Sequence, residues 1–427
     1  MHVAIVTPAY PPLPGGGERY VGALAHGLAA RGVGVTVVTS AATTEADLWN
    51  GVAANGAPAS LATTPPEMTG DVPVIRLPIS PFPGRRRGLM LWRKVMVVLS
   101  ALPGDRPATL LRLARRFPAI EGLEAALAGL ADVSLIHAFN VSWEYGLVAG
   151  HAAARAAAVP LVVTPFAHLG AGAGDRVARN STMQHQLAIL EAARRVLVLT
   201  SVERDGLVGF GLPAARIAVI GGGVDAPPGD LAASPHWEEA SHLPEPYFVF
   251  VGRLSFDKGA LHAVQAILRL RQRGRAVALA LVGSTTPEFE RFHRGLSAVE
   301  RAGLRVLGVL PERDKHAVVA RSRGLLLPSH SDSFGIVLLE AWSHGRPVVA
   351  ARAGGIPGVV DEGVNGLLVP FGDVAGLATA VERLLDDETL ARQLGESGRA
   401  KVAGAYSWAA VAERVHFHYQ DILAAPA

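Results

Sequence analysis

The polar residues best placed for chemistry follow an apolar run that ends at Leu327. Asp332 lies in the loop after that run, and Glu340 is the single acid of the apolar stretch Ile336–Trp342. Because a carboxylate is costly to bury unless polar groups surround it, we expect Glu340 to contact a ligand rather than to occupy a surface position. The free backbone N–H groups of a helix starting here would also face an anion. These N–H groups belong to Phe334, Gly335, Ile336 and Val337.

Two cations form a second candidate site. Arg253 and Lys258 follow another apolar run, and a glycine flanks each on its outer side. An arginine binds phosphate through its planar fork and a lysine acts as a point charge, so the pair could clamp a diphosphate. A surface loop with solvated charges is the alternative interpretation.

Glycines near the start of the sequence offer a third candidate. Gly16 and Gly17 stand between a first apolar run and a helical pattern. Glycine lets backbone N–H groups approach an anion closely, and the start of the helix adds a favourable dipole. A tight turn is the alternative. The segment has neither the Gly-x-Gly-x-x-Gly pattern nor the Lys-Ser/Thr of a P-loop, so it does not support a nicotinamide site.

One of the fifteen histidines has an informative position. His168 follows the apolar run Pro160–Pro165, so it should emerge at the carboxyl end of a strand. Open parallel sheets bind their ligands at that end. We expect most of the other histidines to be ordinary surface or core residues.

The elements that must position these residues alternate between short apolar runs and helical patterns, as in parallel α/β sheets. Residues 1–225 form the first predicted domain and residues 245–405 the second, with a proline-rich linker between them. We expect two doubly wound, Rossmann-like domains that face a central cleft, which would be the ligand site. A helix over about residues 408–427 should pack back on the first domain.

The individual elements follow from the same patterns. Strands are predicted at His2–Thr7, Val33–Thr39, Ser134–Phe139, Pro160–Pro165, Arg195–Thr200, Arg216–Ile220, Tyr247–Val251, Val277–Val282, Arg305–Gly308 and Gly324–Leu327. Helices are predicted at Glu18–Arg31, Phe289–Ala302, Gly335–Ser343 and Trp408–Leu423. Residues Glu45–Asp71 should be an irregular excursion.

Composition excludes several classes of protein. The chain has 427 residues, of which 50% are hydrophobic and 18% charged, so it can bury large cores and is not a disordered chain. Cysteine is absent, which excludes a disulfide scaffold, a zinc-thiolate site and a thiol nucleophile. The charge-free stretch Ala156–Gly174 is interrupted by prolines and does not predict a membrane helix. Met1–Gly17 lacks a basic leader, so we expect no signal peptide.

The formal net charge of +3 conceals a local excess. Arg85–Arg116 contains nine basic residues against one acid, Asp105. The segment is also partly amphipathic, and basic amphipathic segments dock on anionic lipid surfaces. A solvated helix, or one packed on its own domain, is the alternative. Nucleic acid is not an expected partner, because no recognised binding module accompanies the charges.

Considered together, these segments identify a family. The motifs are Gly16–Glu18, Gly252–Leu254, Lys258–Gly259, Pro328–Ser329, Phe334–Glu340 and Arg352–Pro357. In this order and spacing the chain resembles the retaining, nucleotide-sugar-dependent glycosyltransferases of family 4, also called group 1. The resemblance covers nearly the whole length and implies the GT-B fold of two Rossmann-like domains.

The resemblance implies a role for each candidate residue. Arg253 and Lys258 would neutralise the leaving diphosphate, and Glu340 would accept hydrogen bonds from the ribose hydroxyls. Asp332 would face the hydroxyls of the donor sugar. His168 matches the active-site histidine near the transferred sugar. Backbone N–H groups that would line the phosphates and sugar are those of Gly16, Gly17, Phe334, Gly335, Ile336 and Val337.

Two positions depart from the family pattern. The family has Glu-x7-Glu where this chain has Asp332 and Glu340, so the first side chain is one methylene shorter. Gly358 stands where the family often has glutamate after Gly-Gly-Ile-Pro. The first departure bears directly on which donor sugar the site prefers.

The expected function is transfer of a hexose-type sugar, with retention, from a UDP-, GDP- or ADP-sugar to a glycan or lipid-linked acceptor. We expect no metal and no other cofactor, since no obvious metal-ligand cluster occurs in the sequence. The expected location is cytoplasmic, on the inner face of a membrane. The rivals are a noncatalytic nucleotide-sugar-binding or scaffold protein of the same fold, and a phosphorylase or epimerase.

Overall fold

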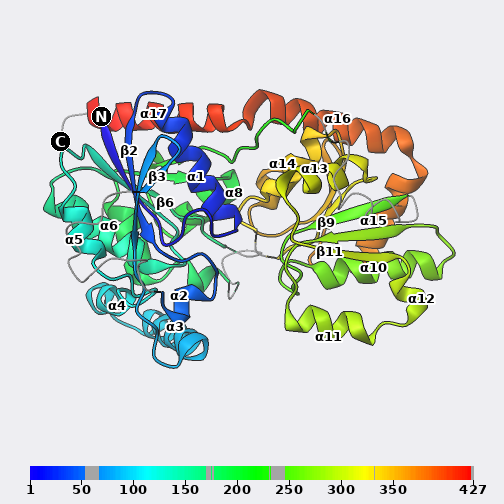
Figure 1. The fold of residues 1–427 in the computed structure, drawn as a ribbon, viewed down its shortest axis with the longest axis horizontal. Helices are drawn as coiled ribbons and strands as arrows, with labels where there is room; N and C mark the ends of the chain where they lie inside the picture. Colours follow the sequence, from blue (N-terminus) through cyan, green and yellow to red (C-terminus); the bar gives the residue numbers. More distant parts are fainter. Residues whose placement is uncertain are drawn as a thin grey trace. The chain divides into compact units, whose positions relative to one another are not determined.

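The computed structural model describes residues 1–52, 67–169, 175, 177–229, 231, 246–330 and 332–424. Contacts divide the chain into two compact units, Met1–Gly221 with Trp408–Ala427, called unit 1 here, and Gly222–Ser407, called unit 2. Each unit contains a predominantly parallel sheet with helices around it (Figure 1). The predicted α/β class is confirmed.

Unit 1 contains an eight-stranded sheet in the order β3-β4-β2-β1-β5-β6-β7-β8. Neighbouring strands are parallel except β3 and β4. The strands are β1 (His2–Val6), β2 (Gly34–Ser40), β3 (Glu67–Thr69), β4 (Val72–Leu77), β5 (Leu135–Phe139), β6 (Leu161–Thr164), β7 (Arg195–Val198) and β8 (Ile217–Val219). The α-helices are α1 (Gly16–Ala29), α2 (Asp47–Asn50), α3 (Arg85–Ala101), α4 (Pro107–Ala114), α5 (Leu123–Ala128), α6 (Glu144–Ala156), α7 (Gln184–Ala192), α8 (Ser201–Gly209) and α17 (Trp408–Ala424), with 3-10 turns at Ala178–Asn180 and Ala214–Arg216.

Unit 2 contains a six-stranded parallel sheet in the order β11-β10-β9-β12-β13-β14. The strands are β9 (Tyr247–Val251), β10 (Ala278–Val282), β11 (Leu304–Gly308), β12 (Leu325–Leu327), β13 (Val348–Ala351) and β14 (Gly366–Val369). The α-helices are α10 (Ala260–Gln272), α11 (Pro287–Gly295), α12 (Ala298–Arg301), α13 (Glu312–Arg321), α14 (Ile336–Ser343), α15 (Val374–Asp386) and α16 (Glu388–Ala405), with a 3-10 turn at Ile356–Gly358.

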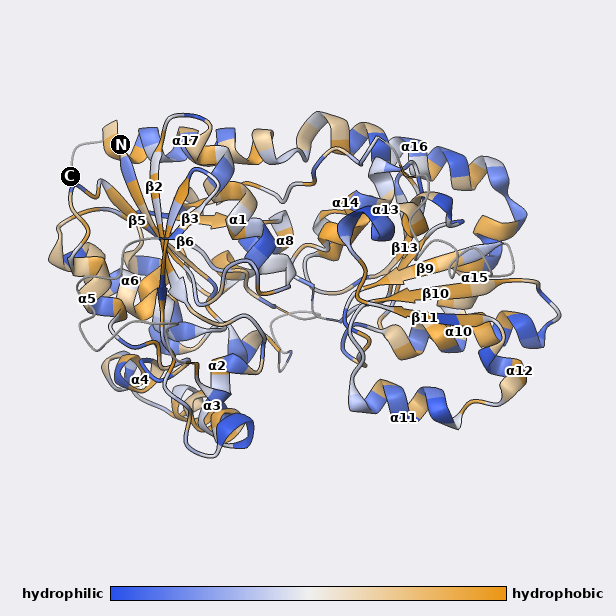
Figure 2. Ribbon diagram, in the orientation of Figure 1, coloured by the Kyte–Doolittle hydropathy of each residue, from blue (hydrophilic) through white to orange (hydrophobic). Residues whose placement is uncertain are grey.

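Helices cover the central strands on both faces, which explains why these strands are continuous apolar runs. All residues of β9, β10, β12 and β13 are buried. The ribbons of β9 and β10 accordingly carry the hydrophobic colour along most of their length (Figure 2). Because the strands are parallel, the loops that follow them gather at one edge of each sheet. The candidate residues lie in these loops or in the helices that follow them.

Helix α17 closes unit 1. It runs beside α1 (Figure 1), and Trp408 packs edge-to-face on Tyr20 with ring centroids 5.3 Å apart. The hydroxyl of Tyr419 lies 2.5 Å from Nδ1 of His137, which is fully buried in β5. A Cβ at Gly27 would lie 2.8 Å from Cβ of Ala412, so a glycine permits this close helix packing. Helix α17 thus completes the hydrophobic core that surrounds α1.

Several elements differ from the sequence-based expectations. The helix predicted over Phe289–Ala302 is broken after Gly295, where Ser297 caps a new helix through its hydroxyl. The predicted irregular excursion contains α2 and β3 at its ends, and the rest of it lies outside the described residues. Strand β4 was not predicted, because Pro73 and Arg76 interrupt its apolar pattern. No helix in the described part of the chain is long and apolar enough to cross a membrane.

Candidate functional site

Two loops of unit 2 meet at the carboxyl ends of β9 and β12. Nζ of Lys258 lies 2.8 Å from Oδ1 of Asp332, and their side chains are 25% and 20% exposed. Gly259 has a φ of +78°, and a Cβ there would lie 2.0 Å from the carbonyl oxygen of Pro328. Only glycine lets the loops come this close. The fold therefore joins two predicted site residues that are 74 positions apart.

The Gly-Gly pair of the motif Arg352–Pro357 holds Asp332 from the other side. The backbone N–H of Gly355 donates to the Asp332 carbonyl at 2.8 Å. A Cβ at Gly354, whose φ is +57°, would lie 2.3 Å from the same oxygen. The two glycines fix the backbone of Asp332, which leaves its carboxylate to contact Lys258.

Arg253 occupies the same loop as Lys258. Its Nη2 lies 3.5 Å from Oδ2 of Asp257, and both side chains are nearly half exposed. A pair this long and this exposed contributes little free energy, on the order of 0 to 1 kcal/mol.

Helix α14 starts at Ile336, in the same segment as Asp332. Its N-cap, Gly335, has a φ of +82°, the left-handed conformation that glycine tolerates. The first backbone N–H groups of an α-helix have no acceptor within the helix, so those of Ile336 and Val337 are available in principle to an anion. The ring of Phe334 is buried and packs edge-to-face on Tyr406 at 5.7 Å. Only the backbone of Phe334 can serve a ligand.

Glu340 is buried in α14, with 1% of its surface exposed. Nζ of Lys315, from α13, lies 2.8 Å from its Oε1 and also contacts both carboxylate oxygens of Glu312, at 2.8 and 3.0 Å. The sequence analysis did not identify Lys315. The local sequence gives one indication that Lys315 is buried. It lies just before the apolar residues Ala317, Val318 and Val319, which face inward in the same helix.

The same cluster has the spacing of a metal site. Ligand atoms of Glu312, His316 and Glu340 lie within 4.8 Å of one another. The Lys315 ammonium contacts both carboxylates, so it supplies the positive charge that a metal ion would otherwise provide. Nδ1 of His316 lies 2.8 Å from Nε2 of His344. The geometry is that of a lysine-centred ion pair, which favours an orienting role for the cluster over metal binding.

In unit 1, α1 starts at Gly16, two residues before the predicted start at Glu18. The Oε2 atom of Glu18 lies 2.0 Å from where a Cβ of Gly15 would be, so the carboxylate folds back over the N-cap. Burial raises the pKa of Glu18. A Cβ at Gly17 would lie 3.6 Å from the ring of Phe166, which places the start of α1 beside the loop after β6. The predicted glycine loop thus carries an acid, Glu18, that belongs to the motif Gly16–Glu18 but was given no role of its own.

His168 is half-buried in that loop, and its backbone N–H donates to the hydroxyl of Ser181 at 3.2 Å. The preceding residue, Ala167, donates its N–H to Oε1 of Glu203 at 2.7 Å, and Leu199 donates to Oε2 at 2.9 Å. Burial raises the pKa of Glu203 to about 7. This fully buried acid joins the loops after β6 and β7, and it was not predicted.

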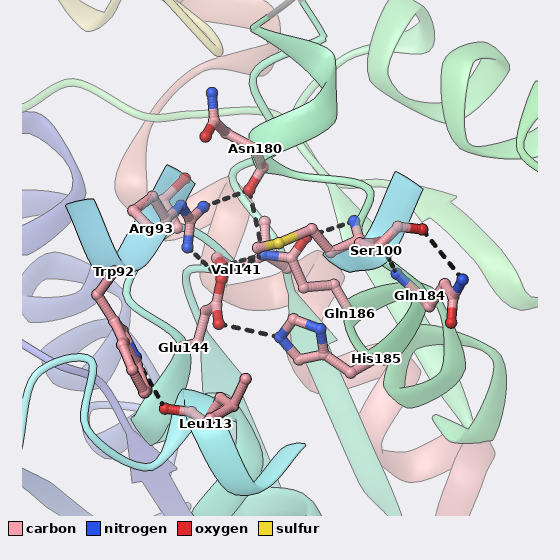
Figure 3. Close-up of polar contacts among 12 residues, drawn as sticks. Trp92, Arg93, Ser100, Leu113, Val141, Glu144, Asn180, Gln184, His185 and Gln186 are labelled. Atoms are coloured by element: carbon pink, nitrogen blue, oxygen red, sulfur yellow. Dashed lines mark hydrogen bonds and ion pairs between the residues drawn. The ribbon is translucent and has the colours of Figure 1, made fainter. Parts of the chain in front are cut away.

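The basic segment forms two helices, α3 and α4, and one of its arginines faces inward. Arg93 is 8% exposed, and its guanidinium donates to Oε1 of Glu144 and to the carbonyl of Asn180. Glu144 lies between Arg93 and His185, whose Nε2 is 2.9 Å from Oε2 (Figure 3). The expectation of a cationic surface is therefore wrong for Arg93, because its side chain is buried in an ion pair with Glu144.

The opposite face of α3 is exposed and mixed in character. Its exposed residues are Arg85, Arg86, Arg87, Met90, Leu91, Lys94, Val95, Val98 and Ala101. Leu91 is 64% exposed and Val98 59%. Apolar side chains at helical spacing beside four cations match the amphipathic pattern of a helix that lies on an anionic surface.

Two family models match the chain. "Glycosyl transferases group 1" matches residues 245–387, and "Glycosyl transferase 4-like domain" matches residues 15–223. A glycogen synthase of Mycobacterium tuberculosis is 33% identical over 211 residues, which is 48% of this chain and 48% of that protein. The alpha-maltose-1-phosphate synthase of Mycolicibacterium smegmatis is 31% identical over 340 residues, covering 72% of this chain and 86% of that protein. The chain thus spans about half the length of the first of these relatives and most of the second.

Solved structures share the fold. Sucrose-phosphate synthase from Thermosynechococcus elongatus matches with a TM-score of 0.71 and 23% identity over 99% of both chains. Anabaena HepE in complex with UDP and glucose matches with a TM-score of 0.66 and 19% identity over 98% of this chain and 99% of that one. These likenesses confirm the predicted GT-B fold class. With both parts of the chain matched by family models and one relative 31% identical over 72% of it, the protein belongs to the group 1 glycosyltransferases.

Proposed function

We propose that the protein transfers a hexose-type sugar, with retention of configuration, from a nucleoside diphosphate sugar to a glycan or lipid-linked acceptor. The observation that carries the proposal is the contact of Lys258 with Asp332, in the loop that leads into α14 at Ile336. An ammonium and a carboxylate are thus in contact, and a helix N-terminus follows in the same loop. Such a set can bind both a phosphate and the hydroxyls of a sugar.

Charge development during the reaction fits these groups. Breaking a glycosyl phosphate bond puts positive charge on the sugar and negative charge on the diphosphate. Fixed cations and helix N-termini act where the negative charge appears and stabilise the transition state. Arg253 and Lys258 take this role, which is why we propose a metal-independent reaction. A phosphate oxygen of the donor would accept the proton of the acceptor hydroxyl, so no second carboxylate is required.

Two further residues, one in each unit, have proposed roles. Glu340, held by Lys315, accepts hydrogen bonds from the ribose hydroxyls of the nucleotide. His168, in the loop after β6, contacts the transferred sugar. Asp332 is one methylene shorter than glutamate, and its carboxylate forms an ion pair with Lys258.

The choice of nucleotide is supported only by analogy. Structural neighbours are described with UDP, UDP-glucose or ADP, so UDP- and ADP-sugars are the first donors to test, with GDP-sugars beside them. The names of the glycogen and maltose-1-phosphate synthases support a hexose. For the acceptor, the exposed face of α3 supports a lipid-linked saccharide at the cytoplasmic surface of a membrane.

The donor site is tested by thermal shift with UDP, GDP and ADP and their glucose conjugates. At least one should raise the melting temperature of the wild type, and Lys258→Ala should reduce this effect at least tenfold in apparent affinity. Lys94→Ala removes an exposed lysine of unit 1 and is the matched control. If no nucleotide stabilises the wild type, or if Lys94→Ala has the same effect, the donor site is wrong.

The alternative is a noncatalytic nucleotide-sugar-binding protein of the same fold. It would bind a nucleotide sugar through the same residues without turnover. Release of nucleoside diphosphate from a bound donor, in the presence of water or an acceptor, distinguishes the two. Donor binding without any release at long incubation would favour the alternative.

A further inference from the structure

A cavity in unit 1 lies apart from the loops described above. Its volume is about 420 Å³, and it is lined by the segments that lead into β6 and β7 and by Arg216, which precedes β8. These are the amino-terminal ends of the strands. His168 and the start of α1 follow the carboxyl ends of strands in the same sheet, at its other edge. The size falls within the range of about 300 to 1,000 Å³ that small-molecule sites occupy.

The polar side chains of this cavity are basic. Arg155, Arg194, Arg216 and His151 line it, and the lining residues include no aspartate or glutamate. Burial and then the charge of Arg155 lower the pKa of His151, so the imidazole is neutral at pH 7. Three permanently charged guanidinium groups therefore line this cavity, and all three arginines are exposed residues.

Helix ends reduce this excess but do not cancel it. Helices α6 and α7 both end at the cavity, at Ala156 and Ala192. Each helix C-terminus is equivalent to roughly half a negative charge, so the two offset about one of the three positive charges. Arginines at helix ends commonly serve this purpose. Arg216 does so as well, although it follows neither helix, because its guanidinium donates to the carbonyl of Glu191 in the last turn of α7.

We propose that this cavity binds a phosphate-bearing metabolite. Guanidinium groups bind phosphate oxygens through paired N–H donors. The apolar part of the wall, formed by Val159, Pro160 and Leu161, contacts the carbon skeleton of the ligand. The site is independent of the proposed transfer reaction, because all its residues belong to one unit and to the opposite edge of the sheet from His168.

Inorganic pyrophosphate is the probe. Calorimetric titration at constant ionic strength uses the full chain carrying Arg253→Ala and Lys258→Ala, which disables the proposed diphosphate site. Pyrophosphate should still bind in this background. Adding Arg155→Gln, Arg194→Gln and Arg216→Gln should weaken binding at least tenfold. The matched control replaces Arg85, Arg86 and Arg87 by glutamine, which removes the same charge from exposed positions of unit 1.

A second variant tests the cavity without changing its charge. Ala192→Trp places a large side chain at an exposed position on the cavity wall, so it should also weaken binding. The proposal is overturned by unchanged affinity in both cavity variants. An equal loss in the Arg85, Arg86 and Arg87 control would overturn it as well, because the binding would then be nonspecific attraction to net charge. Neither result would bear on donor binding, which the background variant lacks.

Discussion

At the scale of single residues, Lys315 determines how Glu340 can act. Removing one partner of a buried ion pair typically costs about 3 to 5 kcal/mol, because the other charge stays buried without compensation. Lys315→Met should therefore lower the affinity for the stabilising nucleotide at least tenfold. It should also remove the preference for that nucleotide over its 2′-deoxy analogue, measured by calorimetry. Lys315→Arg keeps the charge and should restore part of both effects.

A purely structural role for Lys315 would give a different result. The melting temperature would fall while the preference for ribose stayed intact. Glu312→Gln is the matched control, since it removes the exposed partner of Lys315 and leaves the contact with Glu340. We expect it to change the affinity by less than about threefold.

Glu203 provides a pH-dependent contribution to stability. Its pKa of about 7 in the folded state lies above the ordinary value of 4.5, mainly because of burial. Between these two values the folded protein retains a proton that the unfolded chain has released, so stability falls as pH rises from about 4.5 to 7. The shift corresponds to roughly 3 kcal/mol. Urea midpoints at pH 5 and pH 7.5 measure this loss in the wild type.

The variant Glu203→Gln cannot ionise. It should lose some stability at pH 5. Its side-chain NH2 group would face one of the two backbone N–H donors, and that donor would lose its acceptor. The pH dependence attributable to Glu203 should disappear. An unchanged difference between the two midpoints would show that another group causes it.

At the scale of elements, α3 has two faces with different tasks. Arg93 fixes one face to α6 through Glu144, while Leu91, Val95 and Val98 remain exposed on the other beside the arginines at its start. We predict that the full protein binds vesicles containing anionic lipid and that the binding weakens with salt. Replacing Arg85, Arg86 and Arg87 by glutamine should reduce vesicle binding at least fivefold in a flotation assay.

The apolar part of this face is tested separately. Leu91→Ser and Val98→Ser should weaken binding without changing the net charge. Arg155→Gln removes a cation elsewhere in unit 1 and serves as the control for charge. Undiminished binding of the triple glutamine variant, or equal loss in the control, would contradict docking through α3.

At the scale of the whole molecule, the positions of most strands along the chain followed from sequence patterns, but several site residues did not. Tyr247–Val251 was predicted from its apolar run and is β9 with the same bounds, since a buried parallel strand leaves a local pattern. The inward turn of Arg93 depends on Glu144, 51 positions away, and that of Lys315 depends on Glu340, 25 positions away. One sequence contains no local signal for such partners, because they are chosen by tertiary packing.

Strand β4 and the break before Ser297 illustrate the same limit for elements. Val72–Leu77 forms a strand despite Pro73, because it pairs with the neighbouring strand β2. By contrast, the positive φ values at Gly259 and Gly335 occur where the sequence has motif glycines, so backbone conformation at the site could be anticipated from residue type.

The position of α17 has a consequence for synthesis on the ribosome. Unit 1 supplies the first residues to emerge, yet His137 and Tyr20 contact Tyr419 and Trp408, which are translated after all of unit 2. Domains generally fold as they are completed during synthesis. Unit 2 is contiguous and can fold first, whereas the nascent unit 1 exposes the apolar face of α1 until the last helix leaves the exit tunnel. Unit 1 is therefore translated first but completes its folding last, after α17 has been synthesised.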